Sequence, residues 1–466
     1  MAKILFIQKK QLMQKENIAI MQISAVLKAH GHETDLMLIK DKDALDLEAV
    51  RNFQPDIIGF SVMTIDSKWT LDVASLLKGS GIKALIIAGG PHPTFFPDFV
   101  ENENIDIINI GEGEYSMLEL ADAIAQQADY SNIANLHVKQ GGAVKKNMIR
   151  PLLDINELPF PDRGLYLKYD VFRKQKIYNF VISRGCPYNC KFCFVHQWKG
   201  LYKEDKTRNK FRLRDVELAI REIEMLKEQV DVSIVSFVDS TFNLKKEWTL
   251  RFLKAYGERI KIPYTINIRA NLIDEDIVRA IAETGCCQTV RMGIETGSEK
   301  LRKEVLGKNI SDKQIIETMA LLNQYKVKAV VYTMFGIPDE TLDDALKTVE
   351  LTRKIKPFSF SSQMFHPYPG LDITYYAIKK GYISPTDPLK LGDDEFKILN
   401  SLLNQPQIKE VTNLLKLSIV GIKLPFLMPL IKKLIGLKPN VLFNAIYMVS
   451  TFLMLRKYTV VSIFQK

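Results

Sequence analysis

Two series of short apolar segments, each segment followed by a helical pattern, constrain the fold of this chain more than any other feature. The first series occupies residues 1–130, and the second begins at residue 177. Ile, Leu and Val stand at consecutive positions in these segments, which indicates strands that are buried on both faces, as in a parallel sheet covered by helices. The sequence therefore predicts two α/β domains in succession, and 466 residues are enough for both cores.

The first series predicts a doubly wound, Rossmann-like domain over residues 1–135. Its candidate strands are KILFI (3–7), TDLMLI (34–39), DIIGFSV (56–62), KALIIAGG (83–90) and DIINIG (106–111). Glycines follow two of them, in AGGPHP (88–93) and GEGE (111–114). Each could be a simple strand-to-helix turn. Together, at the carboxyl ends of one parallel sheet, they favour a ligand site.

The second series predicts six strand–helix units over residues 177–370, a partial barrel smaller than the usual eight-unit form. Its candidate strands are NFVIS (179–183), SIVSFVD (233–239), YTINIRA (264–270), QTVRMGIE (288–295), AVVYTMFG (329–336) and FSFSSQMF (358–365). A linker over residues 136–176 joins the two domains and contains two prolines in LPFPDRGLY. Residues 371–466 read as a helical C-terminal region.

Three of the five cysteines lie just after the first strand of the barrel, where catalytic loops of parallel barrels lie. Cys186, Cys190 and Cys193 are one thiolate short of a closed zinc or iron–sulfur site. His196 would complete a zinc site, whereas a [4Fe–4S] cluster on three thiolates would keep one iron open for a ligand. The adjacent Cys286 and Cys287 have no ligand geometry, and we expect them to be buried core residues.

The spacing Cys-x3-Cys-x2-Cys, with Phe192 before the last cysteine, resembles the signature of the radical S-adenosylmethionine (radical SAM) superfamily. The resemblance implies a [4Fe–4S] cluster whose open iron is chelated by S-adenosylmethionine. It further implies an external electron donor, such as a flavodoxin or ferredoxin, and reductive cleavage to a 5′-deoxyadenosyl radical.

The same resemblance extends to four later strand ends, which read FVDSTFN (237–243), INIRAN (266–271), RMGIETGS (291–298) and MFGIPDET (334–341). It implies that S-adenosylmethionine is bound by Phe192, Asp239, Ser240, Thr241, Arg269, Glu295, Thr296 and Gly336. Arg269 could pair with the methionine carboxylate of the cofactor in a bidentate manner. For each residue the alternative is turn chemistry or a structural ion pair.

The first domain and linker resemble those of the radical SAM subfamily that carries a cobalamin-binding domain, and the similarity covers about residues 1–370. It implies cobalamin contacts from Ser61, Thr64, Gly89, Gly90, His92, Gly111 and Glu112. One departure matters: the Asp-x-His-x-x-Gly motif that ligates cobalt in other cobalamin domains is missing, because residues 6–20 contain no histidine. We therefore expect cobalamin without histidine ligation, and a domain that no longer binds cobalamin is the alternative.

That subfamily includes methyltransferases and ring-forming or rearranging enzymes. We expect a methyltransferase that acts on an unactivated carbon of a lipid-like or secondary-metabolite substrate. The alternatives are a radical SAM cyclase or rearrangement enzyme and, in another class, an iron–sulfur electron-transfer or regulatory protein. Residues 1–185 and 288–466 contain no cysteine, so a single cluster is expected.

The positive charge of the chain is concentrated at its C-terminal end. Residues 407–466 contain nine Lys or Arg and one acid, Glu410, which accounts for +8 of the net charge of +10. Lysines spaced along apolar helices fit an anionic membrane surface better than a nucleic acid, so no nucleic-acid partner is expected. Burial against the barrel and a true membrane span are the alternatives. MAKILFIQKK lacks the features of a signal peptide, and we expect a cytoplasmic protein with peripheral contact at the inner membrane face.

Overall fold

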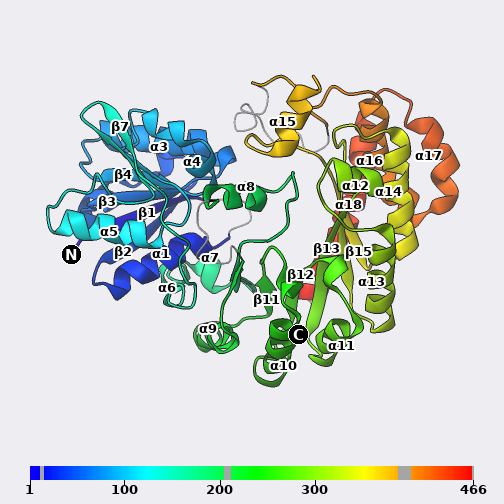
Figure 1. Cartoon of the computed structure of the whole chain (residues 1–466), viewed down its shortest axis with the longest axis horizontal. Coiled ribbons are helices and arrows are strands. Elements are labelled where there is room, and N and C mark those ends of the chain that lie inside the picture. The colour runs from blue at the N-terminus through cyan, green and yellow to red at the C-terminus, as the bar shows by residue number, and fades with distance from the viewer. Residues whose placement is uncertain (11–14, 204–210, 387–399, 464–466) are drawn as a thin grey trace.

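The computed structural model describes residues 1–10, 15–203, 211–386 and 400–463, with side chains described as far as residue 454. Two α/β domains lie side by side, with the cysteine loop between them and the helical C-terminal region on the barrel side (Figure 1). The predicted fold class, an α/β domain followed by a partial barrel and a helical C-terminal region, is confirmed.

The N-terminal domain contains a seven-stranded sheet in the order β2-β1-β3-β4-β5-β6-β7. Its first five strands are parallel: β1 (Lys3–Lys9), β2 (Glu33–Ile39), β3 (Ile57–Ser61), β4 (Leu85–Gly89) and β5 (Ile107–Asn109). Alternate residues of each strand face opposite sides, so Ile4 and Phe6 join one core while Leu5 and Ile7 join the other. This two-sided burial explains the continuous apolar runs of the sequence.

Helices cover both faces of this sheet. The first core is closed by α1 (Ile18–Ala29) and α5 (Glu114–Ala125), and the second by α2 (Leu47–Phe53) and α3 (Ser67–Gly79). The short helix α4 (Pro91–Phe95) follows β4 at the carboxyl end of the sheet. Asn17 caps α1, because its side chain accepts hydrogen bonds from the backbone amides of Ala19 and Ile20.

The N-terminal sheet continues into the region expected to be linker. An antiparallel pair, β6 (Leu136–Gln140) and β7 (Ala143–Lys146), extends it beyond β5. The following short helices, α6 (Gly164–Leu167) and α7 (Asp170–Arg173), place Tyr166 and Phe172 in the core of the N-terminal domain. The segment up to about residue 173 therefore packs as part of the first domain.

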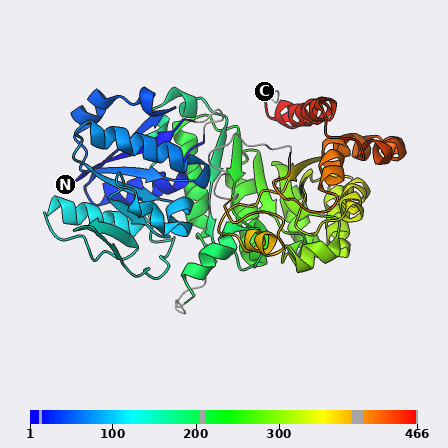
Figure 2. The same ribbon diagram turned by 90° about the horizontal axis from the view of Figure 1, so that it is seen from above.

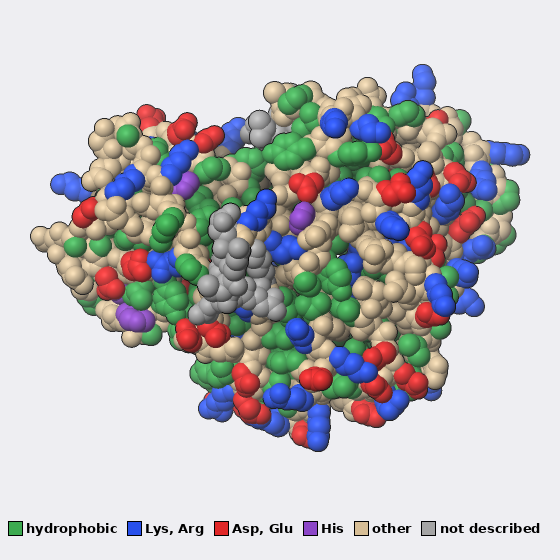
Figure 3. Space-filling view, viewed as in Figure 1, with side chains coloured by type: hydrophobic (Ala, Val, Ile, Leu, Met, Phe, Trp, Pro, Cys, Tyr) green, Lys and Arg blue, Asp and Glu red, His purple; other side chains and the backbone are tan. Residues whose placement is uncertain are grey.

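The second domain is a six-stranded parallel sheet in the order β15-β14-β13-β12-β11-β8, as predicted. Its strands are β8 (Ile177–Phe180), β11 (Ile234–Phe237), β12 (Tyr264–Ile268), β13 (Cys287–Glu295), β14 (Ala329–Phe335) and β15 (Ser359–Met364). The outer helices are α9 (Val216–Gln229), α10 (Lys246–Arg259), α11 (Glu275–Glu283), α13 (Asp312–Gln324) and α14 (Leu342–Ile355). Over α9 to α11, acidic and basic side chains alternate on the surface (Figure 3).

Short elements occupy the carboxyl ends of the barrel strands. A two-stranded antiparallel sheet of β9 (Ser183–Arg184) and β10 (Arg212–Leu213) lies at the domain junction. The helix α8 (Phe194–Leu201) follows the cysteine loop, α12 (Glu299–Glu304) follows β13, and α15 (Asp372–Lys379) follows β15. These elements surround the mouth of the barrel.

The C-terminal region consists of α16 (Ile408–Lys423), the 3-10 turn η7 (Pro425–Leu427), α17 (Met428–Leu434) and α18 (Val441–Ile463). Buried residues of α16, among them Val411, Leu414 and Leu415, form a core with Phe335 and Val349 of the barrel. The helix α16 is therefore an integral cover of the barrel, while α17 and α18 lie outside it (Figure 2). Among the described residues, none of the helices is both long enough and apolar enough to cross a membrane.

Candidate functional site

The three cysteines of the triplet line one cavity of about 340 Å³ at the carboxyl end of the barrel. The loop that carries them runs from β9 to α8, and Cys193 is the residue immediately before α8. Cys186 and Cys193 are partly exposed to the cavity, and Cys190 is buried. One short loop thus presents three thiols to a common space, as an iron–sulfur cluster with three protein ligands requires.

Polar side chains from neighbouring strands approach these thiols. The hydroxyl Oγ1 of Thr241 lies 3.9 Å from the sulfur of Cys186, and Nη1 of Arg269 lies 3.8 Å from the sulfur of Cys190. Burial raises the pKa of the Cys193 thiol, and the nearby thiols of Cys190 and Cys186 raise it further. Binding to iron would reverse this effect on Cys193, because a thiol that coordinates a metal is deprotonated.

His196, the possible fourth ligand of a zinc site, also lines the cavity, and one of its ring nitrogens pairs with an acid of α15. Its Nε2 atom lies 3.1 Å from Oδ2 of Asp372 in α15. Among the described residues, no three His, Cys, Asp or Glu side chains are placed to hold one metal ion together.

Five of the eight residues expected to bind S-adenosylmethionine line the cysteine cavity. These are Phe192, Ser240, Thr241, Arg269 and Glu295. Arg269 lies over the ring of Tyr188, with its guanidinium carbon 3.5 Å from the ring centroid. Its Nε donates to Asn271, 2.8 Å away. These contacts orient the guanidinium group of Arg269 in the cavity.

Asp239 does not line this cavity and instead holds the chain in front of the cysteines. Its Oδ1 accepts hydrogen bonds from the backbone amides of Ile182 and Ser183, at 3.0 and 2.6 Å, and from the Ser183 hydroxyl at 2.5 Å. Burial raises the pKa of Asp239 to about 6, against the opposing effect of these hydrogen bonds. The carboxylate thus fixes the end of the segment that leads into the cluster loop.

Thr296 and Gly336 also lie outside the cavity lining. Thr296 is fully buried, and its hydroxyl lies 3.2 Å from that of Thr348. The amide of Gly336 donates to the buried carboxyl of Glu340 at 2.5 Å, and burial raises the pKa of Glu340 to about 8. Both residues therefore shape the backbone near the barrel mouth.

The structure adds two basic residues to the cavity that were not among the expected site residues: Lys308, which lies outside the motifs, and Arg291, which belongs to RMGIETGS (291–298). Lys308 donates to Glu295 Oε1 and to the carbonyl of Gly293, both at 2.7 Å. Arg291 of β13 also lines the cavity and donates to the carbonyl of Phe237 at 2.6 Å. Lys308 is thirteen residues from Glu295 and outside any motif, so only the folded chain brings the two together.

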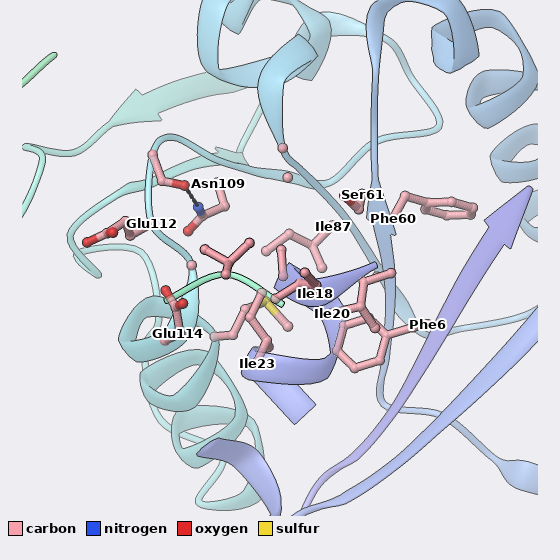
Figure 4. A pocket seen from close by; sticks show the side chains of 18 of the residues that line it. Phe6, Ile18, Ile20, Ile23, Phe60, Ser61, Ile87, Asn109, Glu112 and Glu114 are labelled. Atoms are coloured by element: carbon pink, nitrogen blue, oxygen red, sulfur yellow. Dashed lines mark hydrogen bonds between the residues drawn. The ribbon is translucent and has the colours of Figure 1, made fainter. Parts of the chain in front are cut away.

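A second cavity of about 330 Å³ lies at the carboxyl end of the N-terminal sheet. Of the residues expected to contact cobalamin, Ser61, Gly89, Gly90, Gly111 and Glu112 line it. Apolar side chains from α1 and β1, those of Ile18, Ile20, Ile23 and Phe6, lie together, and the polar Asn109, Glu112 and Glu114 lie at the opposite side (Figure 4). The cavity thus combines a large apolar wall with a polar rim.

Two glycines of this rim have positive φ angles that few other residues adopt. Gly90 has φ +95°, and a Cβ atom there would lie 3.1 Å from the amide nitrogen of Val62. Gly111 has φ +78°, and a Cβ atom there would collide with the hydroxyl of Tyr202 from the barrel domain. At both positions the space that a side chain would need is filled by protein atoms, so only glycine allows the chain to pack this closely at the rim.

Thr64 and His92, also expected to contact cobalamin, do not line the cavity. Thr64 opens a 3-10 turn over Thr64–Asp66, and its carbonyl accepts from the Ser67 hydroxyl at 2.8 Å. His92 packs between the rings of Phe96 and Phe99, and burial lowers its pKa to about 4, which keeps it neutral near pH 7. The structure therefore places His92 in an aromatic cluster beside the rim.

Glu112 of the rim is tied to the barrel domain by two arginines. Its carboxylate lies 3.0 Å from Nη1 of Arg184 and 2.7 Å from Nη2 of Arg212, and Arg184 also pairs with Glu114 at 2.6 Å. Burial opposes ionisation of Glu112, but Arg212 and Arg184 outweigh it and lower its pKa.

Arg184 and Val181 of the barrel line this cavity too, so the two cavities flank one short segment, residues 181–186.

Both domains match known families. Residues 180–352 match the model of the radical SAM superfamily, and residues 13–121 match that of the B12 binding domain. An uncharacterized methyltransferase of Pyrococcus horikoshii, PH0819, is 30% identical over 340 residues, which are 71% of each chain. An anaerobic magnesium-protoporphyrin IX monomethyl ester cyclase of Rubrivivax gelatinosus is 26% identical over 374 residues, 75% of this chain and 64% of the cyclase.

Solved structures share the fold of both domains. The cobalamin-dependent S-adenosylmethionine radical enzyme OxsB superimposes with a TM-score of 0.72 at 15% identity, over 99% of this chain and 72% of OxsB. The radical S-adenosylmethionine methyltransferase TsrM from Kitasatospora setae gives a TM-score of 0.65 at 17% identity, over 82% of this chain and 76% of TsrM.

The cofactors of the two families fit the two cavities. The three thiols of one loop suit a [4Fe–4S] cluster, and the charged groups of the same cavity, Arg269, Arg291 and Lys308–Glu295, suit the charged amino-acid part of S-adenosylmethionine. The glycine rim and apolar wall of the other cavity suit cobalamin. This chain belongs to the radical SAM superfamily and carries a B12 binding domain ahead of its radical SAM domain.

Proposed function

We propose that this protein is a cobalamin-dependent radical SAM methyltransferase. The observation that carries the proposal is the position of the two cavities on either side of residues 181–186: Val181 and Arg184 line the cobalamin cavity, and Cys186 lines the cluster cavity. Two cofactors held there would share one reaction space between the domains.

When bound, the cluster and S-adenosylmethionine supply one-electron chemistry, and cobalamin supplies a transferable methyl group. The chain's own residues hold and orient these groups. Cys186, Cys190 and Cys193 ligate the cluster, and Arg269, fixed by Tyr188, pairs with the cofactor carboxylate. Lys308 forms an ion pair with Glu295 at 2.7 Å and so orients this carboxylate, which would accept hydrogen bonds from the cofactor.

The relatives favour methyl transfer, and one of them supports an alternative reaction. The name of PH0819 calls that relative a methyltransferase, and TsrM is a radical S-adenosylmethionine methyltransferase of the same fold. The second candidate is a radical cyclase, favoured by the 26% identity to the magnesium-protoporphyrin IX monomethyl ester cyclase. The two reactions differ in whether the methyl group of S-adenosylmethionine is consumed.

We further propose a small-molecule substrate that is lipid-like or a secondary metabolite, reduction by a flavodoxin or ferredoxin, and action in the cytoplasm. A reducing compartment suits the five free thiols and the iron–sulfur cluster. The apolar C-terminal helices support a substrate that partitions into lipid.

The test is turnover by anaerobically reconstituted, cobalamin-loaded protein with methyl-deuterated S-adenosylmethionine and a reductant. We expect both 5′-deoxyadenosine and S-adenosylhomocysteine, with the second dependent on added cobalamin. Cys190→Ser should abolish 5′-deoxyadenosine formation, and Cys286→Ser, whose thiol lies outside the cavity, should not change it.

The product ratio distinguishes the candidates. Formation of 5′-deoxyadenosine without S-adenosylhomocysteine, at any cobalamin concentration, would contradict methyl transfer and favour the cyclase. The absence of both products would overturn both enzyme proposals and leave an electron-transfer or regulatory protein.

A further inference from the structure

The last described helix, α18, is more apolar on its outward face than on its inward face. Its exposed positions up to residue 454 are Val441, Leu442, Ala445, Met448, Val449, Phe452 and Leu453, all of them apolar. The large ones among them are between 57% and 82% exposed. They recur every three or four residues, so they form one continuous stripe along the helix.

The inward face of α18 packs Phe443 and Ile446 against the core and also carries the polar groups of the helix. Tyr447 is buried and donates to the carbonyl of Ser362 in β15 at 2.8 Å. Asn444, Ser450 and Thr451 are only partly exposed. A helix that packs on a domain and faces water has the opposite distribution, with apolar residues inward and polar ones outward. The outward stripe therefore indicates a surface that meets something other than water.

The segment just before α18 also exposes large apolar side chains, and it carries positive charge. Leu424, Phe426, Leu430 and Leu437 are large apolar side chains that are at least 44% exposed. Lys432, Lys433 and Lys438 are exposed among them, and no acidic residue follows Glu410 in the sequence. Both α17 and α18 pack on α16, so these side chains belong to one small helical unit.

We propose that this C-terminal surface, the exposed side chains of residues 424–453, binds the face of an anionic lipid bilayer. The apolar stripe would enter the boundary between headgroups and acyl chains, and the lysines would contact lipid phosphates. Because α18 packs on α16 and β15 along its first half, the helix lies on the bilayer as part of the folded domain. The proposal stands independently of the reaction that the enzyme catalyses.

A second copy of the chain fits this surface less well. It would bring two sets of exposed lysines together with no acid of either C-terminal segment to neutralise them. An anionic bilayer offers an apolar interior and negative charge at once. The charge of the segment therefore favours lipid over self-association.

Flotation of the full-length, cluster-loaded protein with phosphatidylcholine vesicles, with and without phosphatidylglycerol, tests the proposal. We expect binding that requires phosphatidylglycerol and weakens with salt. Because each basic residue near an anionic surface contributes roughly fivefold in affinity, the pair Lys432→Glu and Lys433→Glu should weaken binding by about 30-fold or more. The same charge change on the N-terminal domain, Lys40→Glu with Lys83→Glu, should leave binding within about twofold, because these lysines lie on the other domain.

A second pair of variants tests the apolar stripe. Met448→Gln with Phe452→Gln replaces exposed side chains, so the fold and the cluster absorbance should be unchanged while vesicle affinity falls by about tenfold or more. Wild-type protein that fails to float with phosphatidylglycerol vesicles would overturn the proposal. So would a stable dimer, seen by light scattering, that these two substitutions dissociate.

Discussion

Nη1 of Arg184 lies 3.0 Å from Oε1 of Glu112, and this ion pair joins the two domains where their cavities meet. Arg184 precedes the first cluster cysteine by two residues, and Glu112 belongs to the glycine rim of the cobalamin cavity. The hydrogen bonds from Arg212 to Glu112, at 2.7 and 2.9 Å, reinforce the junction. This cluster of charges therefore fixes the glycine rim of one cavity relative to the segment that leads into the cysteine loop of the other.

Replacement of Glu112 by Gln should destabilise the protein strongly. The side chains of Glu112 and Arg212 are each 9% exposed, and removal of the charge of Glu112 leaves Arg212 without this counter-ion and Arg184 with Glu114 alone. We expect a loss of about 3–5 kcal/mol in the free energy of unfolding, measured by urea denaturation. Glu119→Gln is the matched control: it breaks an exposed pair with Arg150 and should cost less than about 1 kcal/mol. Equal losses in the two variants would contradict the role of Glu112.

The same ion pairs predict that the stability of the folded protein depends on pH. Because the pKa of Glu112 is lowered in the folded protein, its contribution is complete above the ordinary value of 4.5 and is lost as the pH falls through the lowered folded value. The difference in melting temperature between wild type and Glu112→Gln should therefore shrink below about pH 4.5. A difference that stays constant between pH 7 and pH 3 would show that the charge of Glu112 is not the stabilising feature.

Arg269→Lys should weaken binding of S-adenosylmethionine without loss of the cluster. A lysine keeps the positive charge but cannot stack flat on Tyr188 or present two parallel donors to a carboxylate. A charge-assisted hydrogen bond of about 1.5–3 kcal/mol corresponds to an affinity lower by about 10- to 100-fold, measured by calorimetry on the reconstituted protein. Iron content should be unchanged.

The control for this variant is Arg259→Lys, because Arg259 forms its ion pairs with Glu217 and Glu224 outside the barrel mouth. If Arg269→Lys binds S-adenosylmethionine as tightly as the wild type, Arg269 does not contact the cofactor.

The strands were predictable from sequence wherever burial on both sides makes them continuously apolar. The five parallel strands of the first domain and the six of the barrel appear where the apolar runs predict them. The hairpin of β6 and β7 was not predictable from the sequence. Its strands mix Leu136 and Val138 with polar residues such as Lys139 and Lys145. The strand β7 has no buried residue, so its sequence has no apolar alternation that would indicate a strand.

The residues of the candidate site were predictable where they belong to sequence motifs. The cysteine triplet and the neighbouring Thr241, Arg269 and Glu295 converge on one cavity. Motifs do not reveal which way a side chain turns: Asp239 binds the backbone before the cysteines, and Glu112 pairs with arginines of the other domain. No sequence motif indicates Lys308 as a site residue, because only the folded chain brings it next to Glu295.

The cofactor content of the full-length protein, purified without oxygen, tests the central claim most directly. Two cavities that hold two cofactors predict about one cobalamin and about four irons per chain. Gly111→Val, which would place a branched side chain against Tyr202, should lower the cobalamin content and leave iron unchanged, whereas Cys190→Ser should lower the iron. Protein that holds four irons but no cobalamin, even after reconstitution, would contradict the account.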